Sequence, residues 1–364
     1  VHLHGEPLAT DDLTDLSLLT LDAVAVIRAG PEVTEPLVSW AHLLPENPEG
    51  SRWEIHPDRP AHRIDLDFPN FIREIEAEIG RKLKVLDADG TGERAILVHL
   101  ARPGDPQQEA WDIAELRDLA STAGLDVVDV VVQRRKPDTR TFIGRGRLTS
   151  LIIEAMQRHV DLLVMSPGLT PAQIRAISEL AEIRVIDRTQ LILDIFAQRA
   201  RSADGKVQVE LAQLRHLLPR LVGTGKAMSR LMGGIGGRGP GETQLEVDRR
   251  RINRRISTLE KALEQLSRER ANRRRRRSRA GIPVISIVGY TNAGKSTLLN
   301  TLTRAKAVAE DRLFATLDPF SKRLRFPRDR EVILTDTVGF IRELPKTLVQ
   351  AFRATLEELE QADL

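Results

Sequence analysis

Residues 289–296 read Gly289-Tyr290-Thr291-Asn292-Ala293-Gly294-Lys295-Ser296, directly after the apolar run Ile282-Pro283-Val284-Ile285-Ser286-Ile287-Val288. The run predicts a buried strand, and the stretch from Thr297 to Leu302 predicts a helix. A G-x-x-x-x-G-K-S loop between them is typical of phosphate binding, because its glycines let successive backbone N–H groups converge on phosphate oxygens. The helix adds its positive N-terminal end. We therefore predict a nucleoside triphosphate site, with a structural glycine turn as the alternative.

Two further segments follow in the order that a switch-type nucleoside triphosphatase requires. Asp336-Thr337-Val338-Gly339 comes after the apolar segment 331–335, which predicts Asp336 beside Mg²⁺ and the Gly339 N–H near the γ-phosphate. Between the two sites lies Phe314-Ala315-Thr316-Leu317-Asp318-Pro319, whose Thr316 hydroxyl can reach Mg²⁺. We therefore predict Ser296 and Thr316 as metal ligands, and Lys295, Thr316 and Gly339 as catalytic residues.

The residues predicted to bind the nucleotide belong to these three segments. They are Gly289, Tyr290, Thr291, Asn292, Ala293, Gly294, Lys295, Ser296, Thr297, Phe314, Ala315, Thr316, Leu317, Asp318, Asp336, Thr337, Val338 and Gly339.

The residue after Gly339 bears on the rate of nucleotide hydrolysis. Ras-like GTPases usually carry a glutamine there, which orients the attacking water, whereas this chain carries Phe340. A phenylalanine side chain has no hydrogen-bonding group for water. We therefore predict slow hydrolysis by the free protein and stimulation by a partner. A role for Phe340 in packing under the loop is compatible with this prediction.

Composition limits the class of protein. The 364 residues include no cysteine, which excludes disulfides, thiolate metal sites and cysteine nucleophiles. No apolar run approaches the roughly 20 residues that span a bilayer, and no secretory signal is evident, so we expect a cytoplasmic protein without membrane insertion. The chain begins with Val1, and no Asn-Lys pair follows Gly339. Both ends therefore look cut, and we expect a nucleotide-binding domain that is C-terminally incomplete and lacks a guanine-reading motif.

Positive charge is concentrated in one segment. Residues 242–280 carry fourteen Lys/Arg and six Asp/Glu, in a chain with a net charge of +3. Apolar residues recur there every seven positions, which predicts one helix of a coiled-coil hairpin. Its partner is expected at Val207–Leu221, ending or kinking near Pro219. The seam consists of Leu245, Ile252, Leu259 and Leu266, with Ile256 and Leu263 beside it.

The arginines of this segment suggest a partner. Clusters such as Arg249–Arg251 and Arg273–Arg277 suit phosphate backbones, so structured RNA is expected, and a solvated charged face is the alternative. Eight glycines lie between Gly223 and Glu242, at the tip of the predicted hairpin. Such a loop can approach a nucleic-acid backbone closely, although a disordered linker is the alternative.

Upstream, residues 95–200 alternate predicted strands and helices, which predicts a parallel sheet covered on both faces. Gly144 and Gly146 open one of the helices and either hold a phosphate or form a basic turn. The strands are expected at Ala95–Leu100, Val127–Val132, Leu162–Met165 and Arg184–Ile186, and the helices at Trp111–Ala123, Leu148–Arg158, Pro171–Leu180 and Leu191–Arg199. Residues 1–94 contain histidines without metal-ligand spacing, which we interpret as surface polar groups: His2, His4, His42, His56 and His62.

The combination resembles the HflX family of ribosome-associated GTPases. The resemblance extends from about Ala95 to Leu364 and implies four parts: an N-terminal extension (1–94), an α/β domain (95–200), a helical hairpin (201–280) and a P-loop G domain (281–364). The segments that carry the resemblance are Val185–Thr189, Ile192–Phe196, Arg238–Thr243, Asp248–Ile252, Gly289–Thr297, Phe314–Pro319 and Asp336–Ile341.

The resemblance implies a function beyond what the residues show. It implies binding of GTP and Mg²⁺, hydrolysis of GTP, docking on the large ribosomal subunit and its rRNA, and ribosome splitting or rescue under stress. The glycine-rich loop would probe rRNA near the peptidyl-transferase region, and residues 95–200 would be linked to ATP binding. An ATP-dependent RNA or ribosome remodelling enzyme and a non-catalytic rRNA-binding factor remain alternatives. No DNA partner is expected; the sequence gives no oligomeric state, and a monomer is the working expectation.

Overall fold

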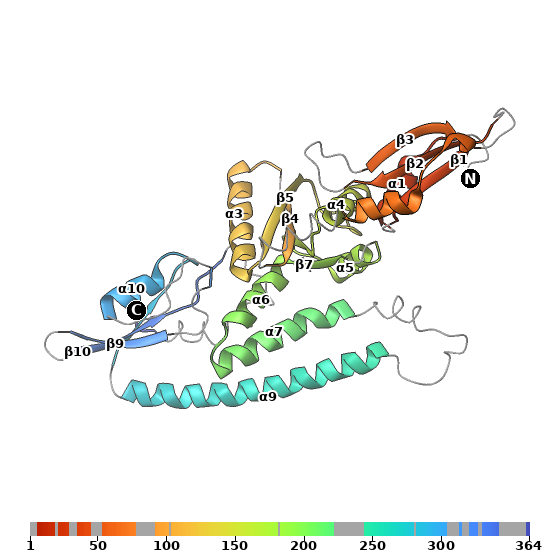
Figure 1. Cartoon of the computed structure of the whole chain (residues 1–364). Coiled ribbons are helices and arrows are strands. Elements are labelled where there is room, and N and C mark those ends of the chain that lie inside the picture. The colour runs from red at the N-terminus through yellow and green to blue at the C-terminus, as the bar shows by residue number, and fades with distance from the viewer. Residues whose placement is uncertain are drawn as a thin grey trace. The chain divides into compact units, whose positions relative to one another are not determined.

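Three β-sheets with helices between their strands form the described part of the chain, so the predicted α/β class is confirmed (Figure 1). The chain divides into two compact units, one of residues 1–101, 125–163 and 176–185 and one of residues 102–124, 164–175 and 186–364. No described helix is both long enough and apolar enough to span a bilayer. The computed structural model describes residues 6–18, 21–28, 35–44, 53–77, 92–101, 103–180, 183–221, 244–279, 282–303, 313–314, 320–326, 330–341 and 362–364.

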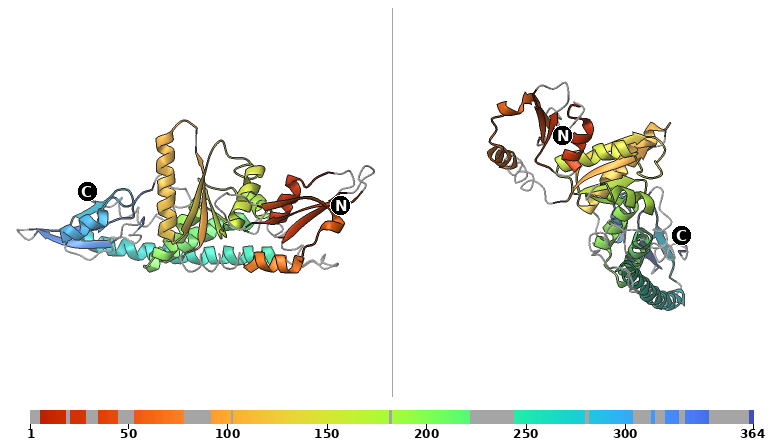
Figure 2. Two further views of the ribbon diagram at one scale, coloured as in Figure 1. Left: turned by 45° about the horizontal axis from the view of Figure 1, so that its top comes forward. Right: turned by 90° about the vertical axis from the view of Figure 1, so that its right-hand side faces the viewer.

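The first sheet is antiparallel and lies in the region 1–94. Its strands are ordered β1-β2-β3, and helix α1 lies against β1 and β2 (Figure 2). Leu16 and Ala41 are fully buried between the helix and the sheet, which gives this small sheet a hydrophobic core. The elements are α1 (Thr10–Leu18), β1 (Ala23–Arg28), β2 (Leu37–Leu43), β3 (Trp53–Pro60) and the short 3₁₀ helix η1 (Ala61–Arg63).

The second sheet has four strands in the order β5-β4-β6-β7. Strand β4 pairs with β5 in parallel, with Ala95 opposite Val127, and every residue of β4 after Arg94 is buried. A continuous buried apolar run is typical of a strand inside a parallel sheet, as the sequence predicted. The elements are β4 (Arg94–Ala101), α3 (Pro106–Ala123), β5 (Asp126–Arg134), α4 (Arg145–Gln157), β6 (Leu162–Ser166), α5 (Pro171–Ser178), β7 (Arg184–Asp187) and α6 (Arg188–Arg199).

The ends of these helices follow local capping rules. Helix α3 begins earlier than the predicted Trp111, because the Asp105 carboxylate accepts the Gln108 N–H at 2.9 Å and Pro106 occupies the first helical position. Before α5, the Thr170 hydroxyl accepts the Gln173 N–H, and the Gln173 side chain accepts the Thr170 N–H in return. This reciprocal pair is a capping box.

The basic segment forms α9 (Gln244–Arg279), which lies beside α7 (Ala203–Leu221). The two helices run in opposite directions (Figures 1 and 2). Leu259 of α9 and Leu211 of α7 are buried, and Leu259 is one of the seam residues that the seven-residue spacing predicted. Pro219 lies inside α7, close to its end at Leu221. The glycine-rich loop of residues 223–242 lies outside the described residues.

Ion pairs also join α7 to α9. In each pair, one residue belongs to α7 and the other to α9, and most of these side chains are exposed to solvent. Exposed pairs each contribute about 0–1 kcal/mol, so the apolar seam provides most of the stability of the hairpin. The pairs are Glu210–Arg255 at 2.6 Å, Arg215–Glu260 at 2.7 Å and Asp204–Arg270 at 2.8 Å.

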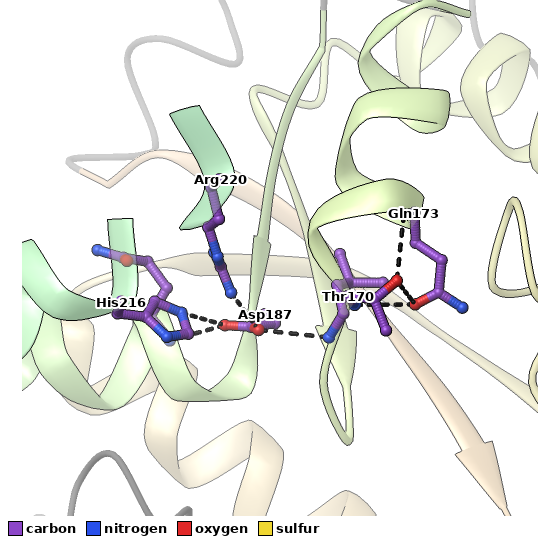
Figure 3. Close-up of polar contacts among 7 residues, drawn as sticks. Thr170, Gln173, Asp187, His216 and Arg220 are labelled. Carbon is purple, nitrogen blue, oxygen red and sulfur yellow. Dashed lines mark hydrogen bonds and ion pairs between the residues drawn. The ribbon is translucent and has the colours of Figure 1, made fainter. Parts of the chain in front are cut away.

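A buried carboxylate connects α6, α7 and the loop after β6 (Figure 3). Asp187, the last residue of β7, is 2% exposed, and its Oδ1 accepts the N–H of Gln190 in the first turn of α6. Two side chains one turn apart on α7 reach the same carboxylate: His216 Nε2 lies 3.2 Å from Oδ1, and Arg220 donates to Oδ2 at 2.5 Å. The Leu169 N–H also donates to Oδ2. These contacts balance the cost of burying the charge.

The pKa of Asp187 reflects this balance. Burial acts to raise the pKa, but the hydrogen bond with His216 and the charge of Arg220 outweigh it, so the pKa of Asp187 lies below its ordinary value. A carboxyl group with a lowered pKa in the folded state stabilises the fold above its unfolded pKa, and this contribution is lost as the pH falls.

Leu259→Ala should lower the free energy of unfolding of the hairpin by about 2–4 kcal/mol, because it removes a buried side chain from the seam. Leu217→Ala on α7 is the matched control, because Leu217 is 42% exposed and should cost less than about 1 kcal/mol. Urea unfolding followed by circular dichroism measures both losses. Equal losses in the two variants would contradict the assignment of Leu259 to the seam.

Asp187→Asn should lower the free energy of unfolding by about 3 kcal/mol at neutral pH, because it leaves the largely buried guanidinium of Arg220 uncompensated. The difference from the wild type should be constant above about pH 4, the ordinary pKa of an unfolded aspartate, and should shrink as the pH falls below it. Urea unfolding at several pH values measures this. Asp118→Asn, on the exposed side of α3, is the control for the loss of one charge. A difference that persists unchanged into acid would contradict the role of the Asp187 charge.

Candidate functional site

The third sheet brings together the ends of strands β8 and β10, which are far apart in the sequence. Its strand order is β8-β10-β9, and β10 pairs with β8 in parallel and with β9 in the antiparallel direction. In this register Asp336, the last residue of β10, lies opposite Ile287, the last residue of β8. The loops after both strands therefore leave the same edge of the sheet, where α/β proteins bind ligands. The elements are β8 (Val284–Ile287), α10 (Lys295–Thr303), β9 (Phe320–Phe326) and β10 (Arg330–Asp336).

The loop between β8 and α10 has the backbone geometry of an anion-binding turn. Asn292 and Gly294 have positive φ angles of 59° and 81°, which turn the backbone before the helix begins. The fully buried Leu299 anchors α10 to the domain. The first N–H groups of a helix have no partner within that helix, so the N-terminus of α10 presents donors and a partial positive charge to this loop. The backbone geometry of Gly289–Ser296 therefore suits an anionic group.

Lys295 lies at the start of α10 and folds back over the loop. Its Nζ donates to the Tyr290 carbonyl oxygen at 2.6 Å. Burial lowers the pKa of Lys295, and the negative charge of Asp336 opposes this shift. The ammonium group is thus partly withdrawn from water beside the anion site, where its interaction with a charged ligand is stronger than in bulk solvent.

Ser296 and Asp336 form the second polar feature. The Ser296 hydroxyl donates to Asp336 Oδ2 at 2.5 Å, and Asp336 is fully buried. A hydroxyl and a carboxylate are the hard oxygen donors that Mg²⁺ prefers, so this pair fits a magnesium ion. Next to it, the Thr337 hydroxyl donates to the Ile287 carbonyl oxygen at 2.7 Å and fixes the start of the loop after β10.

The loop after β10 packs directly on the loop after β8. The Phe340 N–H donates to the Gly289 carbonyl at 3.0 Å, and the Thr291 N–H donates to the Phe340 carbonyl at 2.9 Å. A Cβ atom added to Gly339 would lie 2.5 Å from the Cα of Thr291, so only glycine fits at this contact. These contacts couple the positions of the two loops.

The structure thus brings together the predicted site residues 289–297 and 336–339. Phe314 is buried, and its ring contacts Phe196 of α6 edge to face at 4.7 Å between centroids. The predicted residues Ala315, Thr316, Leu317 and Asp318 lie outside the described residues. The sequence did not reveal the backbone pairing of Phe340 with Gly289 and Thr291, because main-chain contacts leave no side-chain signal.

Three families match successive parts of the chain. A family described as GTP-binding GTPase N-terminal matches residues 111–197, and one described as GTP-binding GTPase Middle Region matches residues 199–277. A third, described as 50S ribosome-binding GTPase, matches residues 284–364 and so includes the loops after β8 and β10.

Curated relatives match most of the chain. GTPase HflX of Caldanaerobacter subterraneus subsp. tengcongensis is 54% identical over 273 residues, which cover 75% of this chain and 63% of that protein. GTPase HflX of Escherichia coli (strain K12) is 48% identical over 281 residues, covering 77% and 66%. The chain therefore spans less than two thirds of the length of these two relatives.

A crystal structure of a GTP-binding protein from the archaeon Sulfolobus solfataricus in complex with GDP is 27% identical to this chain. The match covers 74% of this chain and 68% of that protein, with a TM-score of 0.41.

Proposed function

Since the chain belongs to the HflX family of GTPases, we propose that it binds GTP and Mg²⁺ at the loop Gly289–Ser296, hydrolyses the GTP, and acts on the large ribosomal subunit. The observation that carries the proposal is the contact between Ser296 and Asp336, because it joins the phosphate loop to the end of β10 in one oxygen-donor site. The description of the family that matches residues 284–364 supports the ribosomal partner.

The proposed roles combine the described contacts with the sequence motifs, because Thr316 lies outside the described residues. The loop amides and Lys295 would hold the β- and γ-phosphates, Ser296 and Thr316 would supply hydroxyl oxygens to Mg²⁺, and the Asp336 carboxylate would help to hold the ion. When bound, Mg²⁺ neutralises charge on the phosphate oxygens. Gly339 donates its N–H to the γ-phosphate, and its close contact with Thr291 supports a coupling between the two loops.

Hydrolysis by the free protein is proposed to be slow. The side chain at position 340 cannot hydrogen-bond a water molecule, and its backbone groups already pair with Gly289 and Thr291. A partner that orders the site or supplies a group would accelerate the reaction, as expected for a factor that acts on the ribosome. Loss of the γ-phosphate would relax both loops.

The exposed arginines of α9 support an rRNA partner. Arg249, Arg250 and Arg254 are exposed on the outer side of the hairpin, where the guanidinium groups can contact phosphates. We propose that this surface docks on rRNA, that docking promotes ribosome splitting or rescue under stress, and that the protein acts in the cytoplasm.

Lys295→Ala should abolish binding of GTP without unfolding the protein, because it removes the cation that reaches the phosphates but no buried apolar group. A fluorescent GTP analogue in a titration measures the affinity, and circular dichroism measures the fold. Lys322→Ala, at an exposed position of β9, is the control for the loss of one lysine and should bind like the wild type. Micromolar affinity retained by Lys295→Ala would refute the assignment.

Hydrolysis of GTP and of ATP, each with and without purified large ribosomal subunits, tests the function itself. The full-length protein should hydrolyse GTP slowly alone and at least about tenfold faster with the subunits, because the site lacks a water-orienting side chain. Turnover selective for ATP would favour a remodelling ATPase. Subunit binding without any turnover would favour a non-catalytic rRNA-binding factor, and either result would refute the proposal.

The joint substitution of Arg249, Arg250 and Arg254 by alanine should weaken binding to the large subunit and reduce its salt dependence. If each arginine contacts one phosphate, the slope of log K against log salt should fall by about two to three. Sedimentation at several salt concentrations measures this, with Arg323→Ala and Arg325→Ala on β9 as the control. An unchanged slope with unchanged affinity would remove α9 from the proposed interface.

A further inference from the structure

Strands β2 and β3 place two histidines and a glutamate on one face of the N-terminal sheet. In their antiparallel register, His42 lies opposite Glu54 and Trp40 lies opposite His56. Residues two apart on a strand share a face, so these four side chains project from the same side. The interpretation of His42 as a surface polar group is wrong, because His42 is only 4% exposed.

The three polar side chains lie close together, and the two ring nitrogens of His42 face different partners. His56 Nε2 lies 3.3 Å from His42 Nδ1, and His42 Nε2 lies 3.8 Å from Glu54 Oε2. One potential ligand atom from each of the three residues lies within 4.8 Å of the other two. Zinc–nitrogen bonds of about 2.0–2.1 Å in a tetrahedron place two nitrogens about 3.3–3.4 Å apart, which matches the separation of the two imidazoles.

Aromatic side chains hold both imidazole rings in place. The indole of Trp40 stacks on His56, with 3.7 Å between ring centroids and an interplanar angle of 11°. The ring of Phe71 meets Trp40 and His42 edge to face, at 5.1 Å and 4.9 Å. Packing that fixes the orientation of ligand side chains lowers the cost of ordering them when a metal binds.

We propose that His42, Glu54 and His56 form a binding site for a divalent transition metal, with Zn²⁺ as the expected ion. Two imidazoles and a carboxylate are a common donor set for zinc, and they leave a fourth position for water or another ligand. The Glu54 side chain is 55% exposed, which gives the ion access from solvent. This site lies in the region 1–94 and shares no residue with the candidate nucleotide site.

Isothermal titration of the full chain with Zn²⁺ tests this site, after removal of bound metals by a chelator. Excess Mg²⁺ is included so that the oxygen donors of Ser296 and Asp336 do not contribute. We expect binding of one equivalent, with Kd raised at least about 100-fold by His42→Ala or His56→Ala and at least about tenfold by Glu54→Gln. His62→Ala, in the exposed η1, is the matched control and should bind like the wild type.

Visible absorption of the Co²⁺ form provides a second measurement, because a four-coordinate site with nitrogen and oxygen ligands gives more intense bands than hydrated Co²⁺. Glu54→Gln keeps the size of an exposed side chain and should leave the fold intact, which circular dichroism checks. The Glu54→Gln variant thus distinguishes the loss of a metal-ligating carboxylate from the loss of the fold. No stoichiometric binding by the wild type, or an unchanged Kd in all three variants, would overturn the proposal.

Discussion

The parallel pairing of β10 with β8 is the constraint on which the candidate site depends. It aligns Asp336 with Ile287, so the carboxylate meets the hydroxyl of Ser296 across the edge of the sheet. A shift of one residue in this register would turn Asp336 to the other face and separate the two groups. The same pairing continues beyond the strands, because the main chain of Phe340 bonds to Gly289 and Thr291. The main chains of the two loops are therefore directly paired, which couples their positions.

A second buried carboxylate, that of Asp187, has a comparable structural role where α6 meets α7. Asp187 begins α6 and also receives His216 and Arg220 from α7. Its burial is favourable only while these partners are in place, so the contact specifies one position for α7. The opposite helix, α9, then packs on α7 through an apolar seam and carries its arginines outward. Local capping and long-range charge pairing thus determine how the basic surface is presented.

Local sequence rules predicted the strands and helices between Ala95 and Arg199 and the phosphate loop, because each depends on neighbouring residues: a buried apolar run, a cap or a glycine turn. The seam of the hairpin was predictable for the same reason, since a repeat of seven is visible along the chain. The partners of Asp187 were not predictable, because His216 and Arg220 lie 29 and 33 residues away in no recognisable pattern. His42 and His56 are likewise 14 residues apart, and only the register of β2 and β3 brings them together.

The most direct test of the account is the effect of Mg²⁺ on the rate at which GTP dissociates from the protein. The contact of Ser296 with Asp336 predicts that both residues serve one metal site beside the phosphates. Dissociation from the wild type should therefore be much slower with Mg²⁺ than with a chelator, and Ser296→Ala should abolish most of this difference while retaining measurable GTP binding. A variant that responds to Mg²⁺ as strongly as the wild type would contradict the account.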